Sequence, residues 1–167
     1  MDIDELDAAI LELLDEHQRI SILEIARQLS VARGTVQARI DRLTRTNVIT
    51  GFGPSVNPAA FGFIVTAFVT AEISQDNRDE ETVNYLSSIP EVLEVHTTTG
   101  VGDLFIRVVA RSNSDLQEVI DRIVKSKAIA RTSTVIALAT EVEPRTLPLV
   151  RAVAKQTTAK ENRGRVT

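Results

Sequence analysis

Apolar residues recur at helical spacing in three segments near the start of the chain. The segments run from about Asp4 to His17, from Ile22 to Leu29 and from Arg33 to Arg45. Each has the single apolar stripe of a helix that packs on a core. The stripe residues are Leu6, Ile10, Leu13, Leu14, Ile22, Ile25, Ala26, Leu29, Val36, Ile40 and Leu43. Only residues 30–32 separate the last two helices, which predicts a helix-turn-helix; a plain helical hairpin is the alternative.

Polar residues stand where two of these helices should begin. Asp4 is a natural N-cap for the first helix, and Ser21 with Glu24 has the spacing of a capping box for the second. The third helix follows Ala32, whose side chain accepts no hydrogen bond, so we expect a loosened first turn. Asn47 can adopt the left-handed conformation that closes this helix.

From residue 63 the period of the apolar positions changes to two, the period of strands. The elements then follow in the order β-α-β-β-α-β. Strands are expected at 63–73, Val92 to Thr99, Asp103 to Arg111 and Thr132 to Val142, and helices at Glu80 to Ile89 and after a capping box of Ser114 and Gln117. Helices cover one face of such a sheet, so apolar residues on the other face predict contact with a second protomer. These residues are Phe68, Val135, Ala137 and Ala139.

The same period assigns the inward positions of this region. They are expected to be Phe63, Val65, Ala67, Val69, Ala71, Ile73, Val83, Leu86, Ile89, Leu93, Val95, Thr97, Leu104, Ile106, Val108, Ala110, Leu116, Val119, Ile120, Ile123 and Val124. Together with the three N-terminal helices, this pattern gives an α+β fold class.

Glycine, proline and asparagine interrupt the pattern between the two regions and predict a linker with a short strand. We divide the chain into a helix-turn-helix domain at 1–50, the linker at 51–62, a βαββαβ domain at 63–143 and a C-terminal extension at 144–167. The extension begins with a possible short helix. From residue 156 it is polar enough that we expect disorder.

Charge is distributed unevenly along the chain. The net charge is −4, which alone argues against nucleic acid. Between residues 27 and 45, however, five arginines stand against the single acid Asp41. A basic helix pair in an acidic chain fits local docking on double-stranded DNA. The arginines are Arg27, Arg33, Arg39, Arg42 and Arg45.

Composition argues against several other classes of protein. The sequence contains no run of about 18 apolar residues, the length that would predict a membrane span. The acidic N-terminus lacks the features of a signal peptide, and together with the absence of cysteine this predicts a cytoplasmic protein without disulfides or thiolate metal sites. His17 and His96 have the positions of a helix end and a strand surface, so we expect no metal site, no cofactor and no catalysis.

Helical phasing selects candidate DNA contacts. With Val36, Ile40 and Leu43 inward, the opposite face of the third helix points outward. Gly34 and Ala38 are small enough to allow close approach to the bases, while Arg and Gln can read base edges and Thr or a distal Arg can hold phosphate. The candidates are Arg33, Gly34, Thr35, Gln37, Ala38, Arg42 and Arg45. Any one of them could instead be merely solvated.

Arg39 lies closer to the buried stripe than the other arginines of this helix. We expect it to be partly packed and to bridge to Asp7 on the first helix. This pair is therefore predicted to stabilise the domain rather than to read bases.

A glycine-rich loop joins the second and third predicted strands. Gly100 and Gly102 permit positive φ and can expose N–H groups to a carboxylate, while Asp103 can accept from an α-ammonium. The combination would bind an amino acid; a plain hairpin turn is the alternative. The predicted effector residues are Gly100, Val101, Gly102, Asp103, Thr132 and Thr134.

Six short motifs follow one another in order between residues 3 and 143. They are IDELDAAIL at 3–11, RISILEIA at 19–26, RIDRL at 39–43, ITGF at 49–52, NP at 57–58 and GVGD at 100–103. Together they resemble the Lrp/AsnC, or feast/famine, family of bacterial and archaeal transcriptional regulators. The chain departs from the family pattern at Ala32, where Ser or Thr is usual, at Thr44 and Asn47, and at Gly102, where an aromatic residue is common.

The resemblance implies a winged or extended helix-turn-helix followed by a ferredoxin-like domain that binds an effector and forms oligomers. It also implies a homodimer that assembles to an octamer, double-stranded operator DNA as partner, and an amino acid as effector bound where protomers meet. Two alternatives remain: a haem-pathway decarboxylase of similar fold with His96 as a catalytic residue, and an amino-acid sensor that does not touch DNA. The basic third helix, from Arg33 to Arg45, which would be the DNA-recognition helix, argues against both alternatives.

Overall fold

The protein folds as two compact units. The computed structural model describes residues 3–17, 19–74, 80–126 and 128–164. The first unit is built from the chain up to Ser55 together with the C-terminal segment that begins at Glu143, and the second spans Val56–Val142. The segment expected as a separate C-terminal extension therefore belongs to the first unit.

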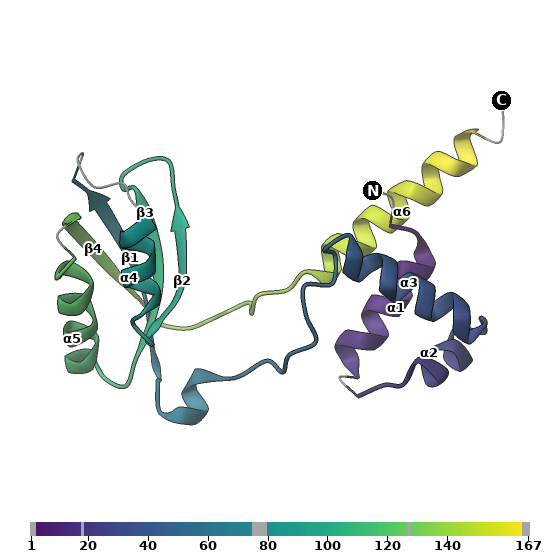
Figure 1. The fold of residues 1–167 in the computed structure, drawn as a ribbon, viewed down its shortest axis with the longest axis horizontal. Helices are drawn as coiled ribbons and strands as arrows, with labels where there is room; N and C mark the ends of the chain where they lie inside the picture. The colour runs from purple at the N-terminus through teal and green to yellow at the C-terminus, as the bar shows by residue number, and fades with distance from the viewer. Residues whose placement is uncertain (1–2, 18, 75–79, 127, 165–167) are drawn as a thin grey trace. The chain divides into compact units, whose positions relative to one another are not determined.

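Helices build the described part of the first unit (Figure 1). They are α1 at Glu5–Glu16, α2 at Ile22–Gln28, α3 at Arg33–Arg45 and α6 at Leu147–Gly164. The apolar stripes of α1, α2 and α3 converge on one core, as predicted. Its buried residues are Ile3, Ala8, Ile10, Ile25, Ala26, Val36, Ile40, Leu43, Ile49 and Ala154. No strand occurs in the described part of this unit, so the wing that the resemblance allowed is absent there.

The helix ends follow the predicted caps only in part. The Ser21 hydroxyl accepts from the Glu24 N–H at 3.2 Å, but Glu24 does not complete a capping box, because its carboxylate pairs with Arg27 instead. α3 begins after Ala32 without a side-chain cap, as predicted. Asn47, just beyond the end of α3, adopts the left-handed conformation with a φ of 58°.

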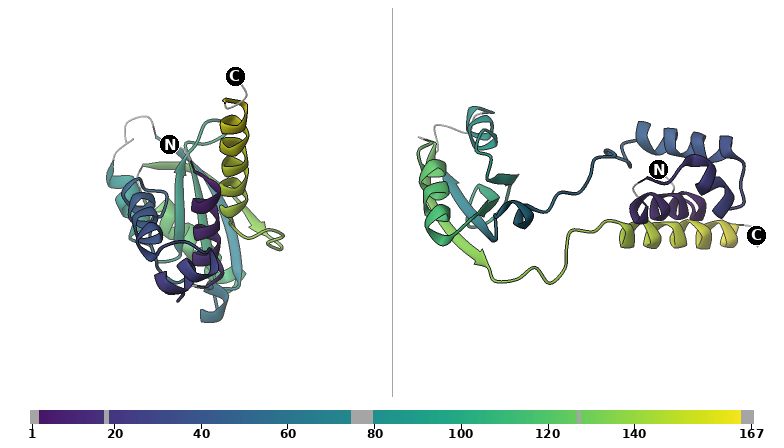
Figure 2. Two further views of the ribbon diagram at one scale, coloured as in Figure 1. Left: turned by 90° about the vertical axis from the view of Figure 1, so that its right-hand side faces the viewer. Right: turned by 90° about the horizontal axis from the view of Figure 1, so that it is seen from below.

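The C-terminal segment is more regular than its polar composition predicts. We expected disorder from residue 156, whereas α6 continues to Gly164; residues 165–167 lie outside the described part. α6 packs on α1 (Figure 2). In this contact Ala154 is fully buried and Arg151 forms an ion pair with Glu12. Docking on a neighbour stabilises a helix that its composition alone favours weakly.

The linker contains a 3₁₀ turn in place of the predicted short strand. The turn, η1, spans Pro58–Phe61, and the Asn57 side chain caps it by accepting from the Ala59 N–H at 3.0 Å. Proline suits the first position of such a turn, where its missing N–H leaves no bond unmade. Gly62 ends the turn with a φ of 87°. Residues 51–57 have no regular secondary structure.

A four-stranded antiparallel sheet with two helices forms the second unit, which confirms the predicted βαββαβ arrangement (Figure 1). Its elements are β1 at Val65–Ile73, α4 at Glu80–Ser87, β2 at Val92–Thr97, β3 at Leu104–Ala110, α5 at Asn113–Val124 and β4 at Ile129–Ala137. The strand order is β2-β3-β1-β4. Leu86 of α4 and Val119 of α5 share one core with the inward residues of β1 and β3, so both helices cover the same face.

β4 and β2 differ most from the sequence prediction, whereas β1 and β3 differ only by one or two residues at their ends. β4 begins and ends earlier than the expected range, because Ile129 already pairs with Ile73 and the ladder stops at Ala137. In β2, an irregularity between Val92 and Glu94 shifts the register. Leu93, expected inward, is consequently 42% exposed.

The two helices of this unit also differ in detail. α5 begins two residues earlier than predicted, because its N-cap is Ser112 and not Ser114. The Ser112 hydroxyl accepts from the Asp115 N–H at 3.1 Å. Val83 and Val124, both expected inward, are exposed at the margins of their stripes. None of the described helices is long and apolar enough to cross a membrane.

Candidate nucleic-acid interface and effector loop

The outward face of α3 presents most of the predicted DNA contacts. Burial of Val36, Ile40 and Leu43 fixes the rotation of the helix about its axis. Six of the seven candidates are consequently exposed: Arg33, Gly34, Thr35, Gln37, Ala38 and Arg45. A Cβ on Gly34 would meet nothing within 4 Å, so the backbone here is open to a close neighbour such as a base edge.

The exposed polar side chains of α3 differ in how they are engaged. Arg33 and Arg45 form no ion pair with any residue that the structure describes. Gln37 donates from Nε2 to the Asp41 carboxylate at 2.7 Å. Because this bond is exposed, water or a base edge can replace it at small cost. The two arginines thus supply positive charge that no described side chain neutralises.

Two arginines of α3 meet two carboxylates at the start of α1. Asp7 is fully buried and accepts from Arg39 Nη1 at 3.1 Å and from Arg42 Nη2. Arg39 also donates to Asp4. The same carboxylates cap α1, since Asp4 accepts from the Asp7 N–H at 2.8 Å and Asp7 from the Asp4 N–H at 3.1 Å. The cap of α1 therefore also holds the recognition helix.

Arg42 occupies a different place from the outward one that helical phasing predicts. Its side chain reaches back to Asp7, and its Nε is buried without a hydrogen-bond partner among the residues that the structure describes. A long side chain can leave the direction of its Cβ when a buried carboxylate lies within reach. In this structure Arg42 thus joins Arg39 as a strut between helices.

Electrostatic interactions favour the charged forms of Asp4 and Arg39. Partial burial alone would raise the pKa of Asp4, but the Asp7 N–H and the Arg39 guanidinium outweigh it and hold that pKa below its usual value. The Asp4 carboxylate in turn raises the pKa of Arg39. The sequence contained a signal for this double bridge, because Asp4 and Asp7 share the i,i+3 spacing of Arg39 and Arg42.

The glycine-rich loop follows β2 and enters β3. Gly100 has a φ of 122°, as predicted, and Val101 at the tip is 91% exposed. Asp103 is half-buried and joins the loop to β1: its N–H donates to Ala71 O at 2.9 Å, and its carboxylate accepts from the Ile73 N–H at 2.8 Å. Asp103 therefore has a structural task as well as its predicted one.

Gly102 is required by close packing rather than by positive φ, which corrects the sequence interpretation. A Cβ at this position would overlap Thr70 Cγ2 and approach Ala71 O to 3.2 Å. An aromatic side chain at position 102, which is common in the family that the sequence resembles, would have no room in this backbone arrangement.

Gly102→Ala is therefore expected to lower the free energy of unfolding of the second unit, the sheet unit at Val56–Val142, by about 1–3 kcal/mol, the usual cost of overpacking. Thermal unfolding of the variant checks this. Gly53→Ala is the matched control, because a Cβ on Gly53 meets nothing within 4 Å. Equal midpoints for the two variants would contradict the packing account.

Thr132 and Thr134 lie on β4, two strands away from the loop. Thr132 pairs with Ala71 and Thr134 with Val69, so both are half-buried on the helix-covered face. Ala71 also pairs with Leu104 of β3. Thr132 thus shares one transverse row of the sheet with the end of the loop, and Thr134 lies one row further away.

The sheet face opposite the helices carries aromatic and apolar side chains. Phe68 of β1 stacks on Phe105 of β3 with ring centroids 5.4 Å apart. Val135 of β4 is 65% exposed beside them. An ion pair of Arg107 with Glu94, at 2.7 Å, borders the stack. An apolar centre with a charged border is typical of a protein interface.

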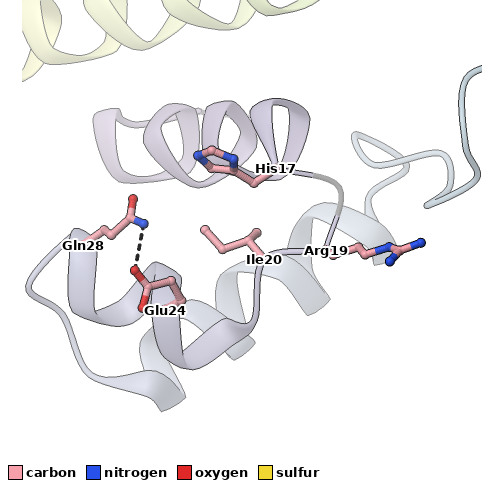
Figure 3. A pocket seen from close by; sticks show the side chains of 5 residues that line it. All are labelled: His17, Arg19, Ile20, Glu24 and Gln28. Atoms are coloured by element: carbon pink, nitrogen blue, oxygen red, sulfur yellow. Dashed lines mark hydrogen bonds between the residues drawn. The ribbon is translucent and has the colours of Figure 1, made fainter.

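A shallow, open cavity of about 640 Å³ lies between the end of α1 and α2 (Figure 3). Its lining residues are His17, Arg19, Ile20, Glu24 and Gln28, which the sequence did not single out as a site. His17 ends α1, as predicted, with its N–H donating to Leu13 O. No group of acids and histidines in the described residues could hold a metal ion.

Comparisons with known proteins cover both units. The model of the AsnC-type helix-turn-helix domain matches residues 3–44, and the model of the Lrp/AsnC ligand binding domain matches residues 66–147. The regulatory protein AsnC of Escherichia coli K12 is 34% identical over 81% of this chain and 90% of its own length. The HTH-type transcriptional regulator Ptr1 of Methanocaldococcus jannaschii is 41% identical over 60% of this chain and 68% of its own.

Solved structures agree with these matches. The structure of E. coli AsnC has a TM-score of 0.81 and 32% identity, and covers 89% of this chain and 100% of that one. A feast or famine regulatory protein from M. tuberculosis, complexed with L-methionine, has a TM-score of 0.76 and 25% identity, and covers 86% and 97%. The relatives with a helix-turn-helix are transcriptional regulators rather than enzymes, so the decarboxylase alternative is wrong.

Proposed function

Because this chain belongs to the Lrp/AsnC family of DNA-binding transcriptional regulators, we propose that it reads specific operator sites as a homodimer and responds to an amino acid. It needs no cofactor for this task, and it works in the cytoplasm, where the operator lies. The observation that carries the proposal is the outward face of α3, where Arg33 and Arg45 have no internal ion-pair partner among the described residues.

Each exposed residue of α3 has a proposed role on DNA. Arg33 and Gln37 reach base edges, for which guanidinium and amide groups are suited. Thr35 and Arg45 hold phosphates, and the small Gly34 and Ala38 let the helix enter the major groove closely. Arg42 has a different role: its hydrogen bond to Asp7 positions α3, so it does not read bases. The exposed arginines also argue against a sensor that never touches DNA.

A second copy of the chain is the proposed occupant of the open sheet face. Stacked Phe68 and Phe105 form its apolar centre, and a two-fold interface uses the same patch on both subunits. Such a dimer presents two α3 helices to half-sites about one helical turn, roughly 34 Å, apart. Further assembly of dimers to an octamer is part of the proposal.

The proposed effector site is the loop at Gly100, Val101, Gly102 and Asp103, with Thr132 and Thr134 as more distant contributors. L-methionine in the complex of the M. tuberculosis relative supports an amino acid as the chemical class. The loop N–H groups would receive the carboxylate, and Asp103 the ammonium group. Coupling between effector and DNA must be reciprocal, so DNA binding also changes effector affinity.

Asp103→Asn tests the effector site. Asparagine keeps an acceptor for the Ile73 N–H but removes the charge that answers an ammonium, so we expect roughly tenfold weaker amino-acid binding with DNA binding retained. Calorimetric titration with L-methionine, then with the other amino acids, measures the effect. Asp121→Asn on the exposed side of α5 is the control. Identical titrations of Asp103→Asn and the control would remove this site from the proposal.

A further inference from the structure

The proposed function gives no role to the C-terminal helix, α6. Apart from Leu147, α6 lies outside both segments that match the family models. The chain leaves β4 at Ala137 and returns from Glu143 onward to the first unit, the DNA-binding unit that contains α1, α2 and α3. α6 is therefore joined through residues 138–146 to the sheet unit while it packs in the other unit.

α6 docks on α1 through small side chains. Ala154 is fully buried, and Ala8 on α1 is 4% exposed in the same core. Small residues on both helices allow a close approach that a larger side chain would prevent. Val150, one turn before Ala154, is half-buried against this core.

Charge complements this apolar contact. α1 with its cap carries six acids and no base from Asp4 to Glu16. α6 brings bases to this acidic helix: Arg151 pairs with Glu12, and Lys155 and Lys160 are exposed nearby on α6. The contact combines a small apolar area with one solvent-accessible ion pair, so it is weak as an interface and depends on being intramolecular.

α1 connects α6 with the recognition helix. Figure 2 (right) shows α1, in purple, between α3, in blue, and α6, in yellow. Asp4, the N-cap of α1, and Asp7 of α1 both accept hydrogen bonds from Arg39 of α3. Any displacement of α1 therefore changes the position of α3.

We propose that α6 is a C-terminal latch that positions α1, and through Asp4 and Asp7 the recognition helix, for full DNA affinity. Ala154 and Arg151 are its positioning residues. The latch also gives the sheet unit a second covalent connection to the DNA-binding unit, in addition to the linker at 51–62. The role goes beyond the proposed function, although its DNA readout rests on the proposed DNA binding.

Ala154→Glu in the full chain tests the latch, because it places a long charged side chain in the buried contact with α1. The matched control is Ala159→Glu, the same substitution at an exposed position of α6. At a temperature where both variants are fully folded, anisotropy titration with the DNA fragment upstream of the chain's own gene is expected to show at least tenfold weaker binding for Ala154→Glu and less than a twofold change for the control. A folded Ala154→Glu protein that binds like the unmodified chain overturns the proposal.

Amide hydrogen exchange tests the latch without DNA. Amides of α3 are expected to lose protection in Ala154→Glu but not in Ala159→Glu; unchanged protection in α3 overturns the proposal. If the unmodified chain binds no DNA fragment, the proposed function fails, while hydrogen exchange still decides the latch.

Charge reversal decides the matter should Ala154→Glu not fold. Arg151→Glu places a third acid beside Glu12 and Glu16 and is expected to lower DNA affinity about threefold. Glu12→Arg combined with Arg151→Glu restores the opposite charges and is expected to recover the affinity. A double variant no better than Arg151→Glu alone contradicts the latch.

Discussion

Replacing Asp7 with alanine is expected to lower the free energy of unfolding of the DNA-binding unit by about 2–3 kcal/mol. The buried carboxylate joins Arg39 and Arg42, so its loss leaves two guanidinium groups without their common partner. Breaking a buried pair costs about 3–5 kcal/mol. The arginine side chains are 30% and 35% exposed, so water can partly replace the carboxylate, which brings the expected cost below that of a fully buried pair.

Amide hydrogen exchange in α1 and α3 is the suitable measurement for Asp7→Ala. The chain has no tryptophan, and its one tyrosine, Tyr85, lies in the other unit, so intrinsic fluorescence does not report on this one. The control is Asp15→Ala, which removes an exposed acid from the same helix. Because Asp7 also orients α3, DNA affinity should fall as well. Equal protection in the two variants would contradict the role of Asp7.

Arg33→Ala is expected to weaken DNA binding about tenfold, since one good arginine contact to a base contributes about 1–3 kcal/mol. Arg27→Ala is the matched control: Arg27 lies on α2 and is already paired with Glu24 at 2.8 Å, so its loss removes little free positive charge. Position in the network, rather than charge alone, thus separates the two arginines.

Titrations at several salt concentrations reveal what Arg33 contacts. If it reads a base, the variant loses more affinity on operator DNA than on unrelated DNA. If it holds a phosphate, the loss is similar on both, and the salt slope falls by about one. Equal effects of Arg33→Ala and Arg27→Ala on DNA binding would refute the assignment of α3 as the reading surface.

Periodicity predicted the fold well because each apolar stripe meets one core. Val36, Ile40 and Leu43 are buried as a helical stripe, and Leu104 and Ile106 as one face of a strand. The errors arose where tertiary contacts override local pattern. The irregularity that exposes Leu93 leaves no mark in a period of two, and α6 extends beyond its predicted end because it docks on α1.

Prediction of the candidate sites was limited by side-chain reach and by close backbone approach. Phasing at 100° per residue gives the direction of a Cβ, but Arg42 turns back to a buried carboxylate. Gly102 reads as a flexible turn residue, whereas the structure shows that neighbouring β1 leaves no space for a side chain. Neither contact is visible until the strands and helices are assembled.

Sequence-specific DNA binding by α3 is the central claim, and a comparison of two duplexes tests it most directly. The affinity of the unmodified chain for the DNA fragment upstream of its own gene is measured against a shuffled duplex of equal length and composition, at one salt concentration, with footprinting of the bound fragment. We predict at least a thousandfold preference for the upstream fragment and protected half-sites about one helical turn apart. Equal affinity for both duplexes, without a footprint, would contradict the account.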